Sequence, residues 1–222
     1  MMPLYRFENG EKSDLSVGKI VCLARNYRKH AEEMESDVSK DPLVFLKPSS
    51  SVIFNNDSIV IPDFTSCVHH EVELGVVIRD RCSKVEKQNA LDYVLGYSVS
   101  IDVTARDIQS IAKENGWPWS IPKGIDTFSP ISNLVLKENV SDPNDLSLML
   151  KVNGKIRQKS STSFMVNKVE RIIEFVSGFM TLYPGDLIMT GTPEGVSEIK
   201  DGDVVEAFLD KHCYLKVNVS KK

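Results

Sequence analysis

Short apolar runs rich in β-branched residues recur along the whole chain, separated by polar or glycine-containing segments. Runs of this kind are typical of β-strands, and those that are apolar on both faces are typical of buried strands. They do not alternate regularly with helical segments, as they would in a doubly wound sheet. The pattern therefore predicts an α+β protein dominated by strands. The expected strands cover residues 19–24, 71–78, 94–103, 146–152, 187–190, 203–209 and 214–219.

Few segments have helical periodicity. The clearest helix is expected to begin at Asn167, a favourable N-cap residue with Glu170 three positions later. A second helix is expected over residues 104–115, ending near Gly116, and the polar stretch 26–34 is compatible with a third. The helix after Asn167 has one apolar face, which would pack against the sheet. This face consists of Val169, Ile172, Ile173, Val176 and Met180.

Three segments between the apolar runs have the composition of turns or loops. Residues 55–58 (Asn-Asn-Asp-Ser) separate 52–54 from 59–61, which predicts a hairpin. Residues 116–130 form a long loop with Pro and Gly that contains Lys123, and loops of this length are typical of lids and binding segments. Residues 190–195 (Thr-Gly-Thr-Pro-Glu-Gly) offer backbone donors suited to an anion, and they also fit a simple tight turn.

Composition and charge exclude several classes of partner. The 222 residues include 27 Lys and Arg against 31 Asp and Glu, a formal net charge of −4, which gives no basic surface for nucleic acid. No stretch approaches the roughly 20 apolar residues of a membrane span, so we expect no membrane partner. Neither a secretory signal nor a transit peptide is visible, which makes the cytoplasm the expected compartment. The four cysteines form no CxxC pair and are interpreted as reduced thiols.

An acidic pair inside an apolar run suggests a metal site. Glu71 and Glu73 are two residues apart in an expected strand, so both point to the same face. This strand offers no cation to offset their repulsion, whereas Mg²⁺ or Mn²⁺ suits carboxylate oxygens. Asp102, at the end of another apolar run, would complete a set of three acids, and His69 falls on the same face by parity. Alternating acids are also common on the exposed face of an ordinary strand, so the pattern alone leaves both interpretations open.

Two further patterns place polar side chains together on expected helices. His30 and Glu33 are three residues apart, and a carboxylate bound to one imidazole nitrogen leaves the other nitrogen as a base. Arg106 and Gln109 have the same spacing near Asp102, where a guanidinium suits a substrate with a carboxylate. Both patterns also fit ordinary charged helices. The motifs of serine hydrolases, P-loop NTPases, dinucleotide-binding dehydrogenases and zinc proteases are absent from the sequence.

Seven ordered blocks carry a further signal: ARNYRKHAEEM (24–34), FLKPSSS (45–51), HHEVELGVVI (69–78), GYSVSIDVTARDIQ (96–109), WPWSIPKG (117–124), LKVNGKIRQ (150–158) and PGDLIMTGTPEGV (184–196). Together they resemble the fumarylacetoacetate hydrolase superfamily, and within it the acylpyruvase and oxaloacetate decarboxylase branch. The resemblance runs from about Lys19 to the C-terminus. It therefore implies a short N-terminal extension, 1–18, and a single catalytic domain, 19–222.

The resemblance also implies a fold and a set of functional residues. The fold is a strand-rich mixed β roll with few short helices, and the protein is expected to form a homodimer. The implied ligands of Mg²⁺ or Mn²⁺ are Glu71, Glu73 and Asp102. The implied catalytic residues are His30, Glu33 and Lys123, and the implied substrate-binding residues are Arg25, Arg106, Gln109 and Thr192. Lys47 lies in a matching block without an assigned role.

The activity implied by the resemblance is that of a divalent-metal-dependent enzyme acting on a small-molecule 2-oxo acid through a metal-bound pyruvate enolate. The reactions are hydrolysis of acylpyruvates such as acetylpyruvate and fumarylpyruvate, decarboxylation of oxaloacetate, and its keto–enol tautomerisation. Alternatives are an isomerase or decarboxylase of 2-hydroxyhepta-2,4-diene-1,7-dioate from aromatic catabolism, and a metal-binding homologue without turnover. The mitochondrial matrix is the alternative compartment.

Overall fold

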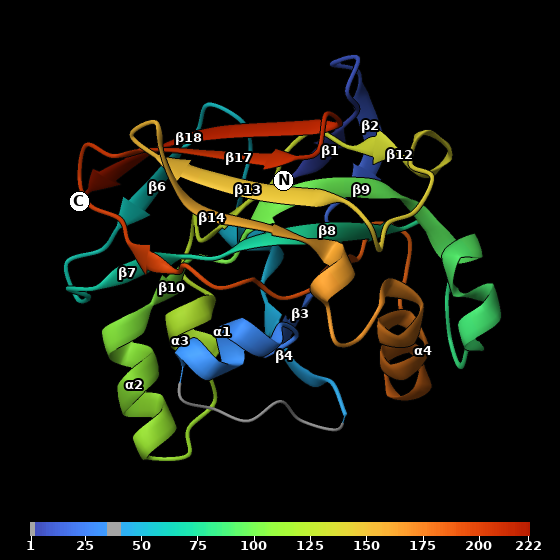
Figure 1. Cartoon of the computed structure of the whole chain (residues 1–222), viewed down its shortest axis with the longest axis horizontal. Coiled ribbons are helices and arrows are strands. Elements are labelled where there is room, and N and C mark those ends of the chain that lie inside the picture. Colours follow the sequence, from blue (N-terminus) through green and yellow to red (C-terminus); the bar gives the residue numbers. More distant parts are fainter. Residues whose placement is uncertain (1–2, 35–40) are drawn as a thin grey trace.

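The computed structural model describes residues 3–34 and 41–222, and two mixed β-sheets form its centre (Figure 1). The larger sheet is mixed because β3 and β15 run parallel while its other neighbours are antiparallel. In order across the sheet, its strands are β12 (Val135–Leu136), β9 (Val94–Ile101), β8 (Val72–Ile78), β15 (Leu187–Met189), β3 (Ile20–Ala24) and β4 (Leu43–Lys47).

The second large sheet and three smaller pairings complete the β structure. The five-stranded sheet has the order β14 (Lys155–Ser161), β13 (Ser147–Val152), β17 (Val204–Leu209), β18 (Cys213–Lys221) and β6 (Ser58–Ile61). A small sheet has the order β10 (Thr104–Ala105), β7 (Val68–His70) and β16 (Ser197–Glu198). The remaining pairs are β5 (Val52–Ile53) with β11 (Ser129–Pro130), and β1 (Leu4–Arg6) with β2 (Lys12–Ser16).

The α-helices are short and lie outside the sheets. They are α1 (Arg28–Glu33), α2 (Arg106–Glu114), α3 (Ser120–Lys123) and α4 (Val169–Phe179), with short 3₁₀ segments at Ser49–Ser51, Lys87–Tyr93, Lys137–Asn139 and Thr162–Phe164. Figure 1 shows α1, α2 and α3 together below the small sheet, with α4 apart from them at the other side. Among the described residues, no helix is both long and apolar enough to cross a membrane.

The central strands of the larger sheet, β9, β8, β15 and β3, are buried on both faces, which explains their nearly continuous apolar sequences. On one face, Val72, Leu74 and Val76 of β8 belong to a core shared with the five-stranded sheet and α4. On the other face, Ile20 and Leu187 pack in a smaller core with residues of the β1–β2 hairpin. In contrast, β17 alternates between buried and partly buried positions and β18 mostly between buried and exposed ones, because one face of their sheet is more open to solvent.

The α+β class and most expected elements are confirmed, but the expected hairpin at 55–58 is wrong. A turn does form there, with Asn56 at φ 71° and the amide of Asp57 bonded to Phe54 O. The flanking strands then part, since β5 pairs with β11 and β6 pairs with β18, both in parallel. Asn55 Oδ1 accepts from the amide of Lys216 in β18, so the turn is tied to another sheet.

The expected cap of the longest helix is also wrong. Helix α4 begins at Val169, and its N-cap is Lys168, whose side chain makes no capping bond. The side chain of Asn144 supplies the cap instead, since its Oδ1 accepts from the amide of Val169 at 3.0 Å and its Nδ2 donates to Glu170. Asn167 is held elsewhere, because its amide donates to Asn26. A cap supplied from 25 residues away leaves no local signal in the sequence.

Candidate active site

Three buried carboxylates meet where β8 begins and β9 ends. Glu73 lies in β8, Glu71 is the residue directly before β8, and Asp102 is the residue directly after β9. The antiparallel pairing of these strands joins the two ends, and the amide of Asp102 donates to Glu71 O at 2.8 Å. One carboxylate oxygen of each residue lies within 4.8 Å of the others. Because Val72 and Leu74 face the core, the two glutamates share the opposite face, as the sequence predicts.

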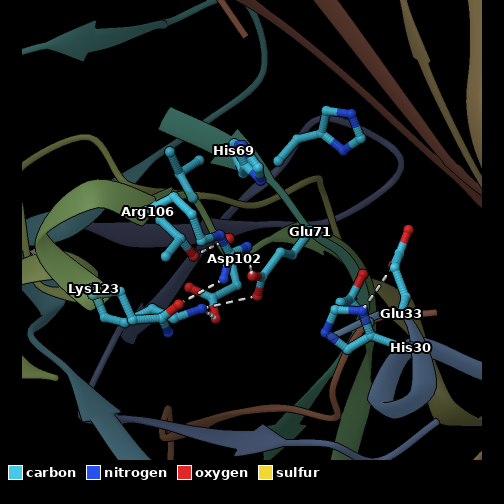
Figure 2. Close-up of polar contacts among 12 residues, drawn as sticks. His30, Glu33, His69, Glu71, Asp102, Arg106 and Lys123 are labelled. Atoms are coloured by element: carbon cyan, nitrogen blue, oxygen red, sulfur yellow. Dashed lines mark hydrogen bonds and ion pairs between the residues drawn. The ribbon is translucent and has the colours of Figure 1, made fainter. Parts of the chain in front are cut away.

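Cations from three other segments balance these acids. Lys123 of α3 donates to Glu71 Oε2 at 2.8 Å and to Asp102 Oδ2 at 2.5 Å. Arg106 at the start of α2 forms an ion pair with Glu71, and Lys47 at the end of β4 donates to Asp102 Oδ1 at 2.6 Å. Figure 2 shows Lys123, Arg106, Glu71 and Asp102 converging from their separate elements. The strand itself offers no cation, but tertiary structure brings three of them to the acids.

The two glutamates differ in their electrostatic surroundings. Burial raises the pKa of Glu71, but Lys123 and Arg106 outweigh it and hold this pKa well below its ordinary value. Burial, with Asp102 and Glu71 close by, raises the pKa of Glu73 well above its ordinary value. The amide of Gly191 donates to Glu73 Oε2 at 2.7 Å, which fixes the side chain. The two neighbouring carboxylates therefore differ in the direction of their pKa shifts, downward for Glu71 and upward for Glu73.

Lys47 supports the site by binding Asp102, a role that its position in the sequence did not indicate. Its side chain is completely buried, and its ammonium donates to Asp102 Oδ1, to Val103 O at 3.1 Å and to Phe128 O at 2.8 Å. All three of its N–H donors are thereby used. Lys47 consequently holds one oxygen of Asp102 in place and has no donor left for a substrate.

Helix α1 carries a histidine–carboxylate pair facing the acids. His30 Nδ1 lies 3.2 Å from Glu33 Oε2, and the amide of Gly195 donates to both oxygens of Glu33 at 3.1 and 3.2 Å. When Nδ1 donates to this carboxylate, Nε2 is the ring nitrogen left to accept a proton. In Figure 2, His30 and Glu33 lie across an open space from Glu71 and Lys123. The expected neighbourhood of His30 and Glu33 is thus present, and it is anchored by the 190–195 loop.

A small pocket of about 40 Å³ joins these parts. Ten residues were expected from the sequence and the resemblance as metal ligands, catalytic residues or substrate-binding residues. Two of them do not line the pocket: Asp102, which contacts Lys123, and Glu33, which contacts His30. Arg106 Nη1 donates to Gln109 Oε1 at 2.6 Å, so the two share one face of α2 as expected. The other eight expected residues line the pocket: Arg25, His30, Glu71, Glu73, Arg106, Gln109, Lys123 and Thr192.

The turn between β3 and α1 brings Arg25 to this pocket. Arg25 has φ 58°, a left-handed conformation that residues with side chains rarely adopt and that is often found at functional sites. The next residue fixes the turn, since Asn26 Nδ2 donates to Thr190 O at 2.8 Å and Asn26 Oδ1 accepts from the amide of Asn167 at 2.7 Å. Asn26 is therefore a supporting residue that the sequence alone did not reveal.

Thr192 is held by a buried network that the sequence also did not reveal. Its hydroxyl donates to Val72 O at 2.9 Å and accepts from Gln158 Nε2 at 2.8 Å. Gln158 Oε1 accepts from the amide of Val72 at 3.0 Å and from His70 Nδ1 at 2.9 Å, while its Nε2 also donates to Pro193 O. The hydroxyl hydrogen of Thr192 thus points into the fold, and Gln158 and His70 tie the 190–195 loop to β8.

His69 does not join the three acids, contrary to the parity argument. It lies in β7, a separate short strand that pairs with β10 and β16. Its Nε2 lies 3.4 Å from Cys67 Sγ. Within the described ranges, the cluster of potential metal ligands consists of the three acids without this histidine. The break between β7 and β8 interrupts the alternation on which the expectation depended.

The chain belongs to the family described as fumarylacetoacetate (FAA) hydrolase C-terminal, which matches residues 19–220. Oxaloacetate tautomerase FAHD1, mitochondrial, from Arabidopsis thaliana is 49% identical over 204 residues, 92% of this chain and 92% of that protein. The protein of the same name from Homo sapiens is 44% identical over 205 residues, 92% of this chain and 90% of that protein. The resemblance drawn from the seven blocks is therefore confirmed.

Solved structures show the same architecture. Fumarylpyruvate hydrolase from Pseudomonas aeruginosa, in complex with Mn²⁺ and pyruvate, superposes with a TM-score of 0.95 at 31% identity, covering 100% of this chain and 97% of that chain. The 2-hydroxyhepta-2,4-diene-1,7-dioate isomerase from Mycobacterium marinum superposes with a TM-score of 0.83 at 39% identity, covering 94% of this chain and 76% of that chain. These similarities confirm the expected fold of the family. The division of the chain at residue 19 stays a prediction.

Proposed function

We propose that the protein is a divalent-metal-dependent enzyme that acts on 2-oxo acids, with tautomerisation or decarboxylation of oxaloacetate and hydrolysis of acylpyruvates as its candidate reactions. The observation that carries this proposal is the convergence of Glu71, Glu73 and Asp102 with Lys123 at one pocket, opposite His30. The relatives named oxaloacetate tautomerase and fumarylpyruvate hydrolase support the choice of 2-oxo acids.

The three acids fit a divalent cation. Their oxygens are hard ligands, they are buried, and they are close enough to share one ion. Glu71, Glu73 and Asp102 would hold the ion, for which we propose Mg²⁺ or Mn²⁺, and the Mn²⁺ in the Pseudomonas relative supports this class of metal. When bound, the ion supplies a Lewis acid for negative charge that develops on the 2-oxo oxygen.

Positive side chains in the pocket would bind the carboxylate of the 2-oxo acid. Arg106 presents a planar guanidinium, which suits bidentate binding of a carboxylate, and Gln109 Oε1 orients it. Lys123 places its ammonium beside two of the acids, where it attracts an incoming anion. We assign Lys123 a role as a fixed cation rather than a Schiff-base nucleophile, because its neighbours Asp102 and Glu71 raise its pKa despite burial.

His30 moves protons in these reactions. For an acylpyruvate, His30 Nε2 takes a proton from water, and the resulting hydroxide attacks the distal carbonyl. The carbon–carbon bond then breaks, its electron pair forms the enolate of pyruvate, and the acyl group leaves as a carboxylic acid. For tautomerisation, His30 exchanges a proton at C3 of oxaloacetate. Glu33 keeps the imidazole in the tautomer that serves as base.

A panel of 2-oxo acids tests the proposal. Purified protein is assayed with oxaloacetate, acetylpyruvate and fumarylpyruvate in Mg²⁺, in Mn²⁺ and after stripping with EDTA. We expect turnover of at least one substrate that is lost without metal and restored by adding it back. Full activity after stripping would refute the metal requirement. Oxalate binding with Mg²⁺ but no turnover of any substrate would favour a homologue that has lost its activity.

The structural neighbour from Mycobacterium marinum makes an isomerase of 2-hydroxyhepta-2,4-diene-1,7-dioate the second candidate function. Adding this dienedioate to the panel tests it directly. If it is turned over while oxaloacetate and the acylpyruvates are not, the second candidate replaces the first.

Two further parts of the proposal concern assembly and compartment. We propose a homodimer, which light scattering on the purified protein tests, with a monomer mass as the contradicting result. We propose the cytoplasm or the mitochondrial matrix as the compartment, and the relatives named mitochondrial support the matrix. Fractionation of the source cells decides between the two.

A further inference from the structure

One basic side chain that lines the pocket, Lys113, forms no ion pair with an acid in the described part of the chain. The four basic side chains of the pocket are Arg25, Arg106, Lys113 and Lys123. Lys123 is engaged by two of the acids, and Arg106 by Glu71. These two cations lie at the end of the pocket where the metal and the first carboxylate of a 2-oxo acid are proposed to bind. Lys113 lies at a different place and has a different environment.

Lys113 extends from the same face of α2 as Arg106, two helical turns further on. The helical rise places their Cα atoms about 10 Å apart along the axis, with Gln109 buried between them. Lys113 Nζ lies 5.7 Å from the ring centroid of Trp119, which also lines the pocket. In the described part of the chain, no carboxylate forms an ion pair with Lys113, in contrast to Arg106 and Lys123.

The field around Lys113 favours an anion. Burial, with Arg106 and Arg25 nearby, lowers the pKa of Lys113. Mutual repulsion of these cations falls when a negative charge lies between them. A monocarboxylic substrate brings its charge only to the Arg106 end of the face. A second carboxylate at the distal end of the substrate would bring a charge to the Lys113 end as well.

We propose that Lys113 binds the distal carboxylate of the substrate, and that it thereby selects dicarboxylic 2-oxo acids over monocarboxylic ones. The inference rests on the proposed function, because the proximal 2-oxo carboxylate must bind beside Glu71 and Arg106. The face of Trp119 holds the ammonium of Lys113 by a cation–π contact and leaves its N–H donors to the ligand. Lys113 is then a specificity residue that takes no part in proton transfer.

The test compares substrates that differ only at the distal group. Fumarylpyruvate is paired with acetylpyruvate, and oxaloacetate with its 4-ethyl ester. Each is assayed with the wild type, with Lys113→Met, which removes the charge, and with Lys113→Arg, which keeps it. Lys155→Met is the matched control, since Lys155 is exposed at the start of β14 and lies outside the pocket. All measurements give kcat and KM separately at fixed ionic strength.

We expect Lys113→Met to lower kcat/KM for the dicarboxylic member of each pair by about 10- to 100-fold, mainly through KM, as for loss of a charged hydrogen bond. The monocarboxylic member should change little, Lys113→Arg should restore most of the preference, and Lys155→Met should match the wild type. Equal losses for both members, or no loss for either, would overturn the inference.

Failure of the proposed function gives a different result, because the wild-type protein then turns over none of the four substrates. In that case, calorimetry in Mg²⁺ compares the binding of oxaloacetate with the binding of its 4-ethyl ester, for the wild type and for Lys113→Met. Weaker binding of the dianion by Lys113→Met, with unchanged binding of the ester, supports the role of Lys113. Equal changes for both ligands overturn it.

Discussion

Acid should destabilise the fold through His70, the buried imidazole beside the active site. His70 is fully buried, its Nδ1 donates to Gln158 Oε1, and its Nε2 accepts from Ser197. Burial lowers the pKa of His70 to about 4, and the neighbouring His69 acts in the same direction, while Gln158 and Glu71 oppose it only partly. In the unfolded chain, the same imidazole titrates near 6.5. Below pH 6.5, the unfolded state therefore binds more protons than the folded state.

The sign and size of the effect follow from this difference in pKa. The free energy of unfolding rises with pH wherever the unfolded state binds more protons. Stability linked to His70 is therefore complete above pH 6.5 and is lost as the pH falls toward 4. Between pH 7.5 and pH 5, keeping His70 neutral costs about 2 kcal/mol, since each pH unit below 6.5 contributes about 1.4 kcal/mol. A loss of this size lowers Tm by about 4–8 °C for a chain of this length.

The assay measures urea and thermal unfolding at pH 7.5 and pH 5 in the presence of EDTA, for the wild type and for His70→Gln. Because other groups titrate in this range, we compare how much the free energy of unfolding falls between pH 7.5 and pH 5 in the two proteins. We expect this fall to be about 2 kcal/mol larger for the wild type than for His70→Gln. His212→Gln, in the turn between β17 and β18, is the control and should keep the wild-type dependence. If His70→Gln also keeps it, the reasoning is refuted.

Three further predictions concern the proposed base His30 and two residues that support the site. Lys47→Met should lower the free energy of unfolding by about 3 kcal/mol and weaken Mg²⁺ binding in calorimetry, because a buried oxygen of Asp102 loses its partner; unchanged Mg²⁺ affinity would contradict this. His30→Ala should reduce acylpyruvate hydrolysis by about 10²- to 10⁴-fold and leave oxalate binding intact, and retained hydrolysis would exclude water activation by His30. Gln158→Leu should destabilise the protein by about 2 kcal/mol or more and raise KM, because Thr192 loses its anchor; a stability change without a change in KM would contradict the link to the loop.

The clustering of the two glutamates could be predicted because their arrangement depends on local periodicity. Glu73 lies in β8 and Glu71 directly precedes that strand with the same parity, while Asp102 directly follows β9, which pairs with β8. The same argument failed for His69, because the chain changes strand between His69 and Glu71. Parity holds only within an uninterrupted strand, and the sequence gives no marker for the interruption.

The supporting residues could not be predicted because their partners are distant in sequence. Lys47 meets Asp102 across 55 positions and Gln158 meets Val72 across 86, so no spacing rule connects them. Helix α3, which positions Lys123, has only four residues and leaves no periodic signal inside the expected loop. The prediction of a hairpin at 55–58 failed for a related reason. Its residues do form a turn, but the partners of the two flanking strands are distant in sequence.

The charge balance of the site supports the proposed preference for a dianionic substrate. The acids Glu71, Glu73 and Asp102 are matched by Lys47, Lys123 and Arg106, so their formal charges sum to −3 + 3 = 0. A divalent ion would bring the sum for these six residues to +2, and Lys113 at the other end of the pocket is not included in it. Buried charge of this size is costly unless it is offset. A 2-oxo acid with two carboxylates supplies two negative charges at the two ends of the α2 face, whereas a monocarboxylate supplies only one.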